Sequence, residues 1–373
     1  PYTTLFRSYI AFLLTVVFVG VANFQQLNGQ NLNPNKVHYP SYQTEHRTNI
    51  TYPKVNGYTV LSCDFHTHTM FSDGLVWPTQ RVAEAWLGGM DALSITDHIE
   101  YRPYRQYTNN DHNTSYEIAK PAAAQTGLTL IKGTEITRTQ RTIGHFNALF
   151  IEDANKIAVD DPKESIKEAK RQGAFVMWNH PGWAVDSTYI KEFQADLFKD
   201  GLIDGIEVYN NTEFYPRVLS WAIDKNLAII ATTDVHGYVE SGTLQKNGVH
   251  RPVTLVLAKE NSAEGIREAL DSRRTLAYFQ NILAAREDVA KMFVDANLAA
   301  KKVYSDGKTI FINVTNSGSA HYEMKVGNKT YTIPALASVI VTTPETDKKF
   351  INVNFNNIFI YENKTLAHDL YFN

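Results

Sequence analysis

The chain contains a single cysteine, Cys63, among its 373 residues, so the sequence offers no disulfide framework. An excess of basic residues is also missing, because 36 Lys and Arg stand against 39 Asp and Glu. This balance argues against the basic stripe of proteins that bind long nucleic acid. The sequence shows no internal repeat and no low-complexity tract. Aromatic residues are plentiful, with 20 Tyr and 19 Phe, which indicates a folded protein rather than a disordered one.

An uncharged apolar run lies near the N-terminus, from Tyr9 to Ala22, and Arg7 precedes it. A basic residue, a short apolar core and small residues at its end are typical of a secretory signal. The run is shorter than the roughly 20 apolar residues of a spanning helix, although a retained signal anchor is the alternative. We therefore expect a signal peptide over residues 1–22 and a soluble, exported, periplasmic protein without stable membrane insertion.

Residues 23–58 are rich in Asn, Gln, Tyr and Pro without clear periodicity, and they predict an N-terminal arm that either covers the domain or forms a flexible leader. From residue 59 the chain alternates short apolar runs with helical patterns, which indicates β/α units. Strands are expected at 58–66, 90–98, 127–136, 144–151, 174–182, 203–210 and 227–237, helices at 77–89 and 161–173, and a last barrel unit at 251–274.

Residues 63–74, CDFHTHTMFSDG, raise the question of a metal site. In an extended strand the side chains of residues i and i+2 share a face, so His66 and His68 project together. Two convergent imidazoles are a common beginning for a metal site, although a strand with two incidental histidines is the alternative.

Other expected strands also give way to polar residues at their C-terminal ends, as in the active face of a parallel α/β barrel. These polar residues are His66, His68, Asp97, His98, Glu135, His180, Asp234 and His236. His145 differs, because it begins its strand or lies in the loop before it. The joint pattern is hard to produce by accident and favours a metal site.

Six short motifs carry a resemblance to a known family: HTHTMFSDG, ITDH, GTE, GHFN, NHP and TDVHG, over residues 60–285. In this order they resemble the PHP (polymerase and histidinol phosphatase) metal-dependent phosphoesterases. The resemblance implies a distorted (β/α)7 barrel with a trinuclear metal cluster at the strand ends. The flanking sequence is similar to an exported phosphodiesterase branch that acts on organophosphate diesters.

The resemblance also implies nine metal ligands. His66, His68, Glu135 and Asp234 would hold a first ion. Glu135 would bridge to a second ion, which His145 and His180 complete, and Asp73, His98 and His236 would hold a third. Some family members carry His at the position of Asp73, which puts the occupancy of the third site in question. Because every ligand atom is N or O, we expect two to three ions of Zn, Mn or Fe.

The implied reaction is hydrolysis by a water that the metals activate, without a covalent intermediate. The candidate catalytic residues are Glu135, Asp97 and His180. Asp97 would orient the neighbouring ligand or the water, or else is a turn-forming residue. The candidates for binding the substrate phosphate are Arg138, Arg141, Arg102 and His112, and the alternative for each is a solvated loop residue. Trp178, Trp183 and Tyr209 would wall an organic pocket or lie in the core.

The C-terminal part changes character. Residues 287–302 predict a helix, and residues 308–366 alternate apolar and polar residues between Gly, Asn and Pro turns. We expect a small β-sandwich that packs against the barrel. The predicted division is a signal peptide at 1–22, an arm at 23–58, the barrel at 59–285, and a linker helix with a β domain at 286–373.

The function favoured by these patterns is an exported metal-dependent phosphodiesterase acting on small organic phosphate diesters. A phosphomonoesterase or a short-oligonucleotide exonuclease is the alternative within the same chemistry. A noncatalytic metal-binding protein of the cell envelope is the alternative from another class. That alternative expects missing ligands, and none of the nine is missing.

Overall fold

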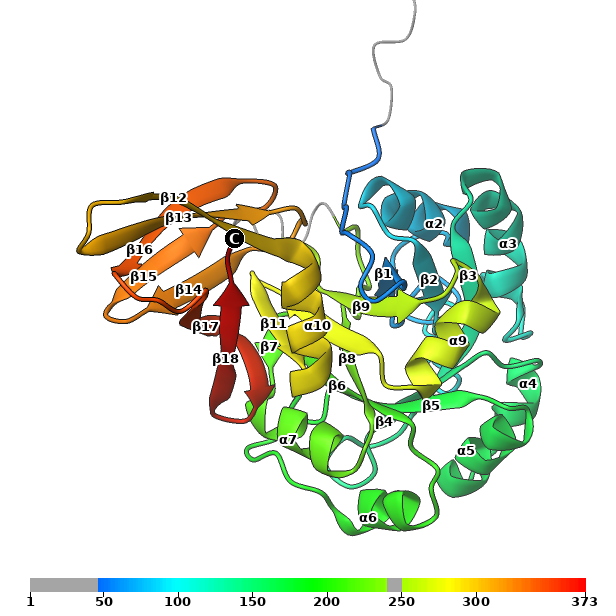
Figure 1. The fold of residues 1–373 in the computed structure, drawn as a ribbon. Helices are drawn as coiled ribbons and strands as arrows, with labels where there is room; N and C mark the ends of the chain where they lie inside the picture. Colours follow the sequence, from blue (N-terminus) through cyan, green and yellow to red (C-terminus); the bar gives the residue numbers. More distant parts are fainter. Residues whose placement is uncertain (1–45, 240–249) are drawn as a thin grey trace, which may run out of the picture. The chain divides into compact units, whose positions relative to one another are not determined.

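A computed structural model describes residues 46–239 and 250–373 (Figure 1). The predicted signal peptide lies outside the described residues, as does the arm up to residue 45. The described part of the arm lies on the folded domain. The amide of Thr48 donates to the carbonyl of Leu87, and the carbonyl of Thr51 accepts from the amide of Ser319.

The barrel strands follow one another in the predicted order. They are β1 (Thr59–Asp64), β2 (Ala92–Ile95), β3 (Thr129–Thr137), β4 (His145–Leu149), β5 (Phe175–Asn179), β6 (Gly205–Asn210) and β8 (Ala228–Thr232). Strands β1, β2 and β3 are parallel, and so are β5, β6 and β8. Strand β4 runs antiparallel to both β3 and β5. This reversal makes the barrel a distorted one, and the predicted fold class is confirmed.

The barrel closes at the seam between β8 and two further strands, β9 (Val253–Ala258) and β10 (Thr275–Phe279). Strand β9 pairs with β1 and β10 through backbone ladders. Between these two strands and β8, hydrogen bonds from threonine side chains take the place of a backbone ladder. The Thr254 hydroxyl accepts from Ala231 N at 3.0 Å and donates to Ala231 O at 2.8 Å, and the Thr275 hydroxyl accepts from Ile229 N at 3.1 Å.

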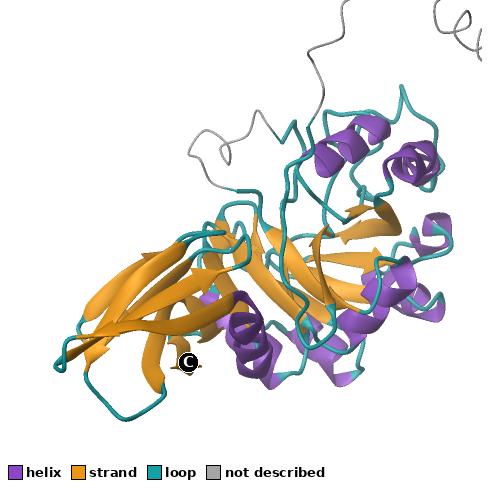
Figure 2. Ribbon diagram, turned by 45° about the horizontal axis from the view of Figure 1, so that its top comes forward, coloured by secondary structure: helices purple, strands orange, loops and turns teal. Residues whose placement is uncertain are grey.

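Helices surround the barrel strands in Figure 2. They are α2 (Pro78–Leu87), α3 (Thr114–Thr126), α4 (Ala154–Ile157), α5 (Pro162–Arg171), α6 (Glu192–Lys199), α7 (Pro216–Asp224), α9 (Ala263–Asp271) and α10 (Glu287–Asn297). Helix α5 begins where Asp161 accepts from the amides of Lys163 and Glu164, a standard N-cap. The periodicity does not predict α3, whose buried face consists of the small residues Ser115, Ala119 and Ala123. Within the described ranges, no helix is long and apolar enough to cross a membrane.

The C-terminal region consists of two packed sheets. Its strands are β12 (Leu298–Ser305), β13 (Thr309–Asn316), β14 (Tyr322–Val326), β15 (Lys329–Ile333), β16 (Ser338–Pro344), β17 (Phe350–Tyr361) and β18 (Lys364–Tyr371). One sheet has the order β12–β13–β16, and β14, β15, β17 and β18 form the other. Strand β17 pairs in parallel with β11 (Ile282–Ala285), which joins the second sheet to the strands of the barrel. A two-stranded pairing of β6 with β7 (Glu213–Phe214) completes the large sheet.

The predicted helix over 287–302 is wrong in its second part, because α10 ends at Asn297 and Leu298 begins strand β12. The Ala-Ala-Lys-Lys sequence has good helix propensity. Pairing of Leu298 with Asn316 and of the following residues with β13 overrides that propensity. A continuous apolar core from Leu93 and Leu255 in the barrel through Phe293 to Phe355 links the barrel to the β region.

The hydrogen bonds of the Thr254 hydroxyl across the seam to β8 should contribute measurably to the free energy of unfolding. Thr254→Val keeps the shape but leaves Ala231 N and O without their partner, so we expect the free energy of unfolding to fall by about 1–3 kcal/mol. Urea denaturation followed by circular dichroism measures it. Thr254→Ser keeps the hydroxyl and serves as the control. Equal stability of Thr254→Val and wild type would show that other contacts close the barrel.

Candidate metal centre

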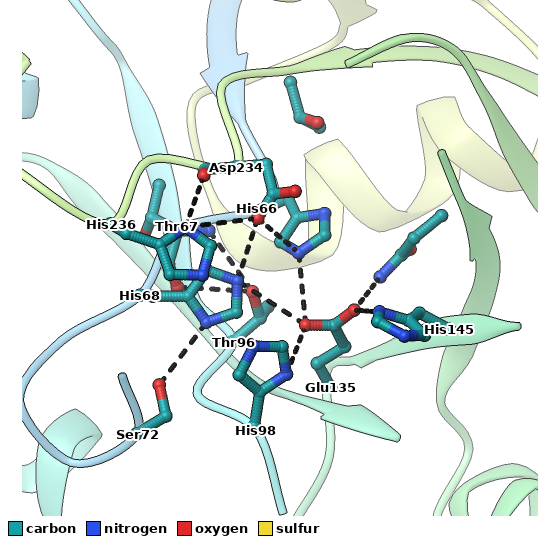
Figure 3. Close-up of polar contacts among 12 residues, drawn as sticks. His66, Thr67, His68, Ser72, Thr96, His98, Glu135, His145, Asp234 and His236 are labelled. Carbon is teal, nitrogen blue, oxygen red and sulfur yellow. Dashed lines mark hydrogen bonds and ion pairs between the residues drawn. The ribbon is translucent and has the colours of Figure 1, made fainter. Parts of the chain in front are cut away.

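All nine predicted ligands lie at one end of the barrel, around the carboxylate of Glu135 (Figure 3 labels all of them except Asp73 and His180). His66 and His68 follow β1, and His98 follows β2. His145 is the first residue of β4. Because β4 is antiparallel, its beginning lies where the parallel strands end. The reversed strand therefore explains why His145 begins its strand, whereas His66, His68 and His98 follow theirs.

The Glu135 carboxylate is fully buried and lies among imidazoles. Its Oε1 is 3.0 Å from His145 Nδ1 and 3.7 Å from His180 Nε2, and its Oε2 is 2.8 Å from His98 Nδ1, 3.4 Å from His66 Nε2 and 3.5 Å from His68 Nε2. One carboxylate thus faces ligands from the strands or strand ends of β1, β2, β4 and β5.

Two aspartates complete the arrangement on either side. Asp234 Oδ1 is 3.2 Å from His66 Nε2 and 3.0 Å from His68 Nε2. Asp73 Oδ1 is 3.4 Å from His98 Nε2 and 3.2 Å from His236 Nε2. Both aspartates are partly exposed, so the centre opens to solvent on this side.

The ligand atoms form three groups compact enough to hold an ion. They are His66, His68 and Asp234; His66, Glu135 and His180; and His68, Asp73, His98 and His236. These groups overlap the three expected sites but share His66 and His68 between neighbours. His145 is outside the groups and contacts Glu135 directly. The geometry therefore brings the expected ligands together.

Several buried ligand atoms in the described part of the chain have no hydrogen-bond partner. They are His66 Nε2, Asp73 Oδ1, Glu135 Oε2 and His180 Nδ1. Buried polar atoms are usually paired, so each unpaired one requires an explanation. Imidazole nitrogen and carboxylate oxygen are ligands that Zn, Mn and Fe accept. The donor set therefore fits divalent metal ions.

The pKa shifts differ among the ligand histidines. Burial opposes the charged form of His66, His98, His180 and His236, but nearby carboxylates outweigh it, raising the pKa of His98 to about 9 and raising the pKa of the other three, so metal binding at these four would release protons. Burial, together with the neighbouring His236 and His98, lowers the pKa of His68 to about 3, so its imidazole stays neutral. Burial opposes ionisation of Glu135, but His98 and His66 outweigh it and hold the pKa of Glu135 well below its usual range. Neutral imidazoles and charged carboxylates are the metal-binding forms.

Glu207 supports the centre and was not predicted from the sequence. It lies in β6, fully buried, and its Oε1 accepts from His66 Nδ1 at 2.8 Å and from the Thr232 hydroxyl at 2.6 Å. Its Oε2 accepts from the amide of His180 at 2.7 Å. The bond to Nδ1 turns Nε2 of His66 towards the other ligands, the usual role of a carboxylate behind a metal-binding histidine. The sequence signal is an acidic residue inside the apolar strand GIEVYN.

Arg81 is a second supporting residue that the sequence did not predict. Its buried guanidinium donates to His68 O at 3.1 and 2.8 Å, to His236 O at 3.3 Å and to Gly237 O at 3.0 Å. Glu84 accepts from its Nη1 at 2.7 Å. One side chain of α2 therefore ties together the two loops that carry His68 and His236.

Asp97 lies beside the centre and outside the three ligand groups. Its carboxylate accepts from the amide and hydroxyl of Thr69, each at 2.7 Å, and from the Ser72 hydroxyl at 2.8 Å. These contacts hold the loop that leads from His68 to Asp73. Asp97 therefore orients a ligand-bearing loop.

The predicted phosphate-binding arginines are largely occupied by protein acceptors. Arg138 pairs with Glu100 and donates to three carbonyl oxygens. Arg102 donates to the carbonyls of Phe71, Asn109 and Asn110. Arg141 is exposed. His112 lines two hollows that share Ile99 and Glu100, next to His98, with volumes of about 520 and 350 Å³.

Of the three aromatic residues proposed to wall an organic pocket, two lie in the core and one lies beside the metal ligands. Trp178 is buried and stacks on Trp221, and Tyr209 is buried and stacks on Phe279. Both belong to the core. Trp183 is exposed, and its ring centroid is 5.2 Å from that of His180.

Comparison with known proteins gives a relative that spans most of the chain. No family model matches the chain. A two-domain protein from Bacteroides vulgatus ATCC 8482, which contains a predicted PHP-like metal-dependent phosphoesterase, is 39% identical, with a TM-score of 0.83 over 87% of this chain and 99% of that one. A metal-dependent phosphoesterase structure from Bifidobacterium adolescentis is 18% identical, with a TM-score of 0.42 over 57% of this chain and 96% of that one. An uncharacterized Methanocaldococcus jannaschii protein, MJ1295, is 37% identical over 57 residues, which are 15% of this chain and 26% of that protein.

The position of Glu207 predicts an effect on metal affinity. Glu207→Gln keeps the size of the side chain but removes the charge that holds His66 Nδ1–H, so we expect metal affinity to fall by about 10- to 100-fold. Competition with a coloured chelator measures this affinity for Zn and Mn. Glu192→Gln, at an exposed position of α6, is the control. Unchanged affinity in Glu207→Gln would exclude the supporting role.

Proposed function

This chain belongs to the PHP-like metal-dependent phosphoesterases, and from this premise we propose that it is an exported phosphodiesterase for small organic phosphate diesters. Its class is therefore that of a metal-dependent phosphoric ester hydrolase. The preference for diesters, the number and identity of the ions, and export are our proposals.

The observation that carries the proposal is the position of Glu135 between the ligand groups. His66, His68, Glu135, His145, His180 and Asp234 would hold two ions, and Asp73, His98 and His236 a third, of Zn, Mn or Fe. When bound, such ions supply an activated water and neutralise charge on the phosphoryl oxygens. Asp97 keeps the Asp73 loop in place, and Glu207 keeps His66 oriented.

A covalent route through the protein has little support. Burial raises the pKa of the Cys63 thiol well above its usual value, and Asp91 and Asp64 raise it further, so the thiolate is disfavoured. The Ser72 hydroxyl donates to Asp97 at 2.8 Å and lies 3.4 Å from Nδ1 of His68, which is a candidate metal ligand and not a free base. Direct attack by water fits these side chains best.

The charges near the centre favour a diester over a monoester. A monoester carries one more negative charge, which additional cations would have to neutralise. Arg102 and Arg138 are already bonded to carbonyl oxygens and Glu100. A singly charged diester therefore fits the available charge better.

Replacement of Glu135 tests the proposed chemistry. Glu135→Ala removes a carboxylate shared between ligand groups, and we expect kcat on bis(p-nitrophenyl) phosphate to fall more than about 100-fold, beyond the usual effect of losing an outer partner. Arg141→Ala, the exposed comparison, should raise KM while keeping a measurable kcat.

Steady-state kinetics, with p-nitrophenyl phosphate alongside and metal analysis of each protein, distinguish the outcomes. Two to three ions per wild-type chain are expected. Near wild-type turnover of Glu135→Ala would exclude this centre as the active site. Cleavage of the monoester alone by wild type would leave the centre in place and remove the diesterase assignment.

Export predicts a processed N-terminus. Arg7 and the apolar run to Ala22 support cleavage, so the mature protein should begin near Asn23. N-terminal sequencing of protein from its native host measures this. Recovery of the intact N-terminus in the membrane fraction would contradict export as a soluble protein.

A further inference from the structure

Two exposed aromatic side chains border the metal centre. Trp183 is 46% exposed and Tyr101 is 56% exposed. Each follows a candidate ligand by three residues, Trp183 after His180 and Tyr101 after His98. Large aromatic rings contribute most when buried, so exposed rings beside a candidate active site indicate a partner that covers them.

Trp183 is held in place by a tight turn that begins at His180. Its amide donates to His180 O at 3.0 Å. Gly182 fits this turn because a Cβ atom there would lie 2.5 Å from the Tyr215 ring. The indole centroid is 5.2 Å from the His180 ring and 5.8 Å from the His145 ring. The turn thus fixes the backbone of Trp183, and its ring lies beside the candidate ligands His145 and His180.

Tyr101 is fixed on another side of the centre. The amide of Ile99 donates to Glu135 O at 3.0 Å, and Glu100 Oε2 accepts from Thr137 N at 2.8 Å. The Tyr101 ring lies 6.2 Å from the His98 ring and lines the hollow of about 520 Å³. It therefore borders the ligand group that contains Asp73 and His98, whereas Trp183 borders the group that contains His180.

We propose that Trp183 and Tyr101 are specificity-determining residues, each of which stacks on a ring substituent of the phosphate diester. This inference rests on the proposed function and narrows its substrate class to diesters that carry a planar ring on both sides of the phosphate. A phosphate bound at the centre would direct one substituent towards Trp183, beside His180, and the other towards Tyr101, beside His98. Stacking on an aromatic side chain tolerates many ring types. Trp183 and Tyr101 would therefore favour diesters that carry planar rings as a class, and would not select a single compound.

The test compares bis(p-nitrophenyl) phosphate with methyl p-nitrophenyl phosphate, which has the same leaving group and only one ring. We expect Trp183→Ala and Tyr101→Ala each to raise KM for the two-ring diester by about 10-fold, a typical effect of losing one stacked ring. On the one-ring diester only one of the two variants should do so. Trp183→Phe and Tyr101→Phe keep a ring and should restore KM.

The controls are exposed aromatics that border no candidate ligand. Tyr371→Ala removes a ring that is 68% exposed on β18 and packs on Phe350, and Tyr304→Ala removes a ring that is 60% exposed on β12. Both should keep the wild-type KM on both diesters. Unchanged KM in Trp183→Ala and Tyr101→Ala, or an equal loss on both diesters in both variants, would overturn the proposal.

A binding measurement separates this inference from the proposed function. Calorimetry with metal-loaded protein compares phenylphosphonate with methylphosphonate, neither of which is hydrolysed. Wild type should bind the phenyl compound about 10-fold more tightly, and the double variant Trp183→Ala/Tyr101→Ala should lose that difference. Its retention in the double variant would overturn the inference. Absence of diester cleavage with this ring preference present would refute the diesterase alone.

Discussion

The burial of the Glu135 carboxylate is the constraint on which the rest of the site depends. A charge removed from water is costly unless opposite charges or metal ions compensate it. Here imidazoles from β1, β2, β4 and β5 converge on its two oxygens, within 2.8 to 3.7 Å. The loops that carry the ligands are long, such as the one between Asp64 and Pro78, so buried side chains such as Asp97 and Arg81 hold them in place.

The ligands could be predicted from the sequence because each lies within a short segment at a strand end. His66 and His68 share a face of the chain, and His145 begins its strand for a reason that becomes visible only with the reversed β4. Glu207 and Arg81 could not be predicted in the same way. Their roles depend on contacts between residues 141 and 155 positions apart, and a buried charge in an apolar pattern carries no information about its partner.

In the fold, too, elements with a strong local sequence pattern could be predicted, whereas those that depend on contacts between distant residues could not. Strongly periodic elements such as α5 and the barrel strands follow their sequence pattern closely. The segment after Asn297 does not, because pairing with β13 decides its conformation and outweighs local propensity. Likewise, β-patterning predicted two sheets in the C-terminal region. The parallel pairing of β17 with β11, which joins one of these sheets to the barrel, depends on residues 75 positions apart in the chain.

The seam that closes the barrel lies directly beneath the metal ligands. Asp64, at the end of β1, accepts from Arg251 Nε at 3.1 Å and from the Thr233 hydroxyl at 2.6 Å. His66 lies two residues after Asp64, and Asp234 follows Thr233. The amide of Asp234 also donates to His66 O at 2.9 Å. A barrel closed by a backbone ladder would position these ligands through the sheet itself. Here buried side chains fix the two loops relative to each other, so the geometry of the centre depends on the Asp64–Arg251 pair and on threonine hydroxyls that no metal would contact.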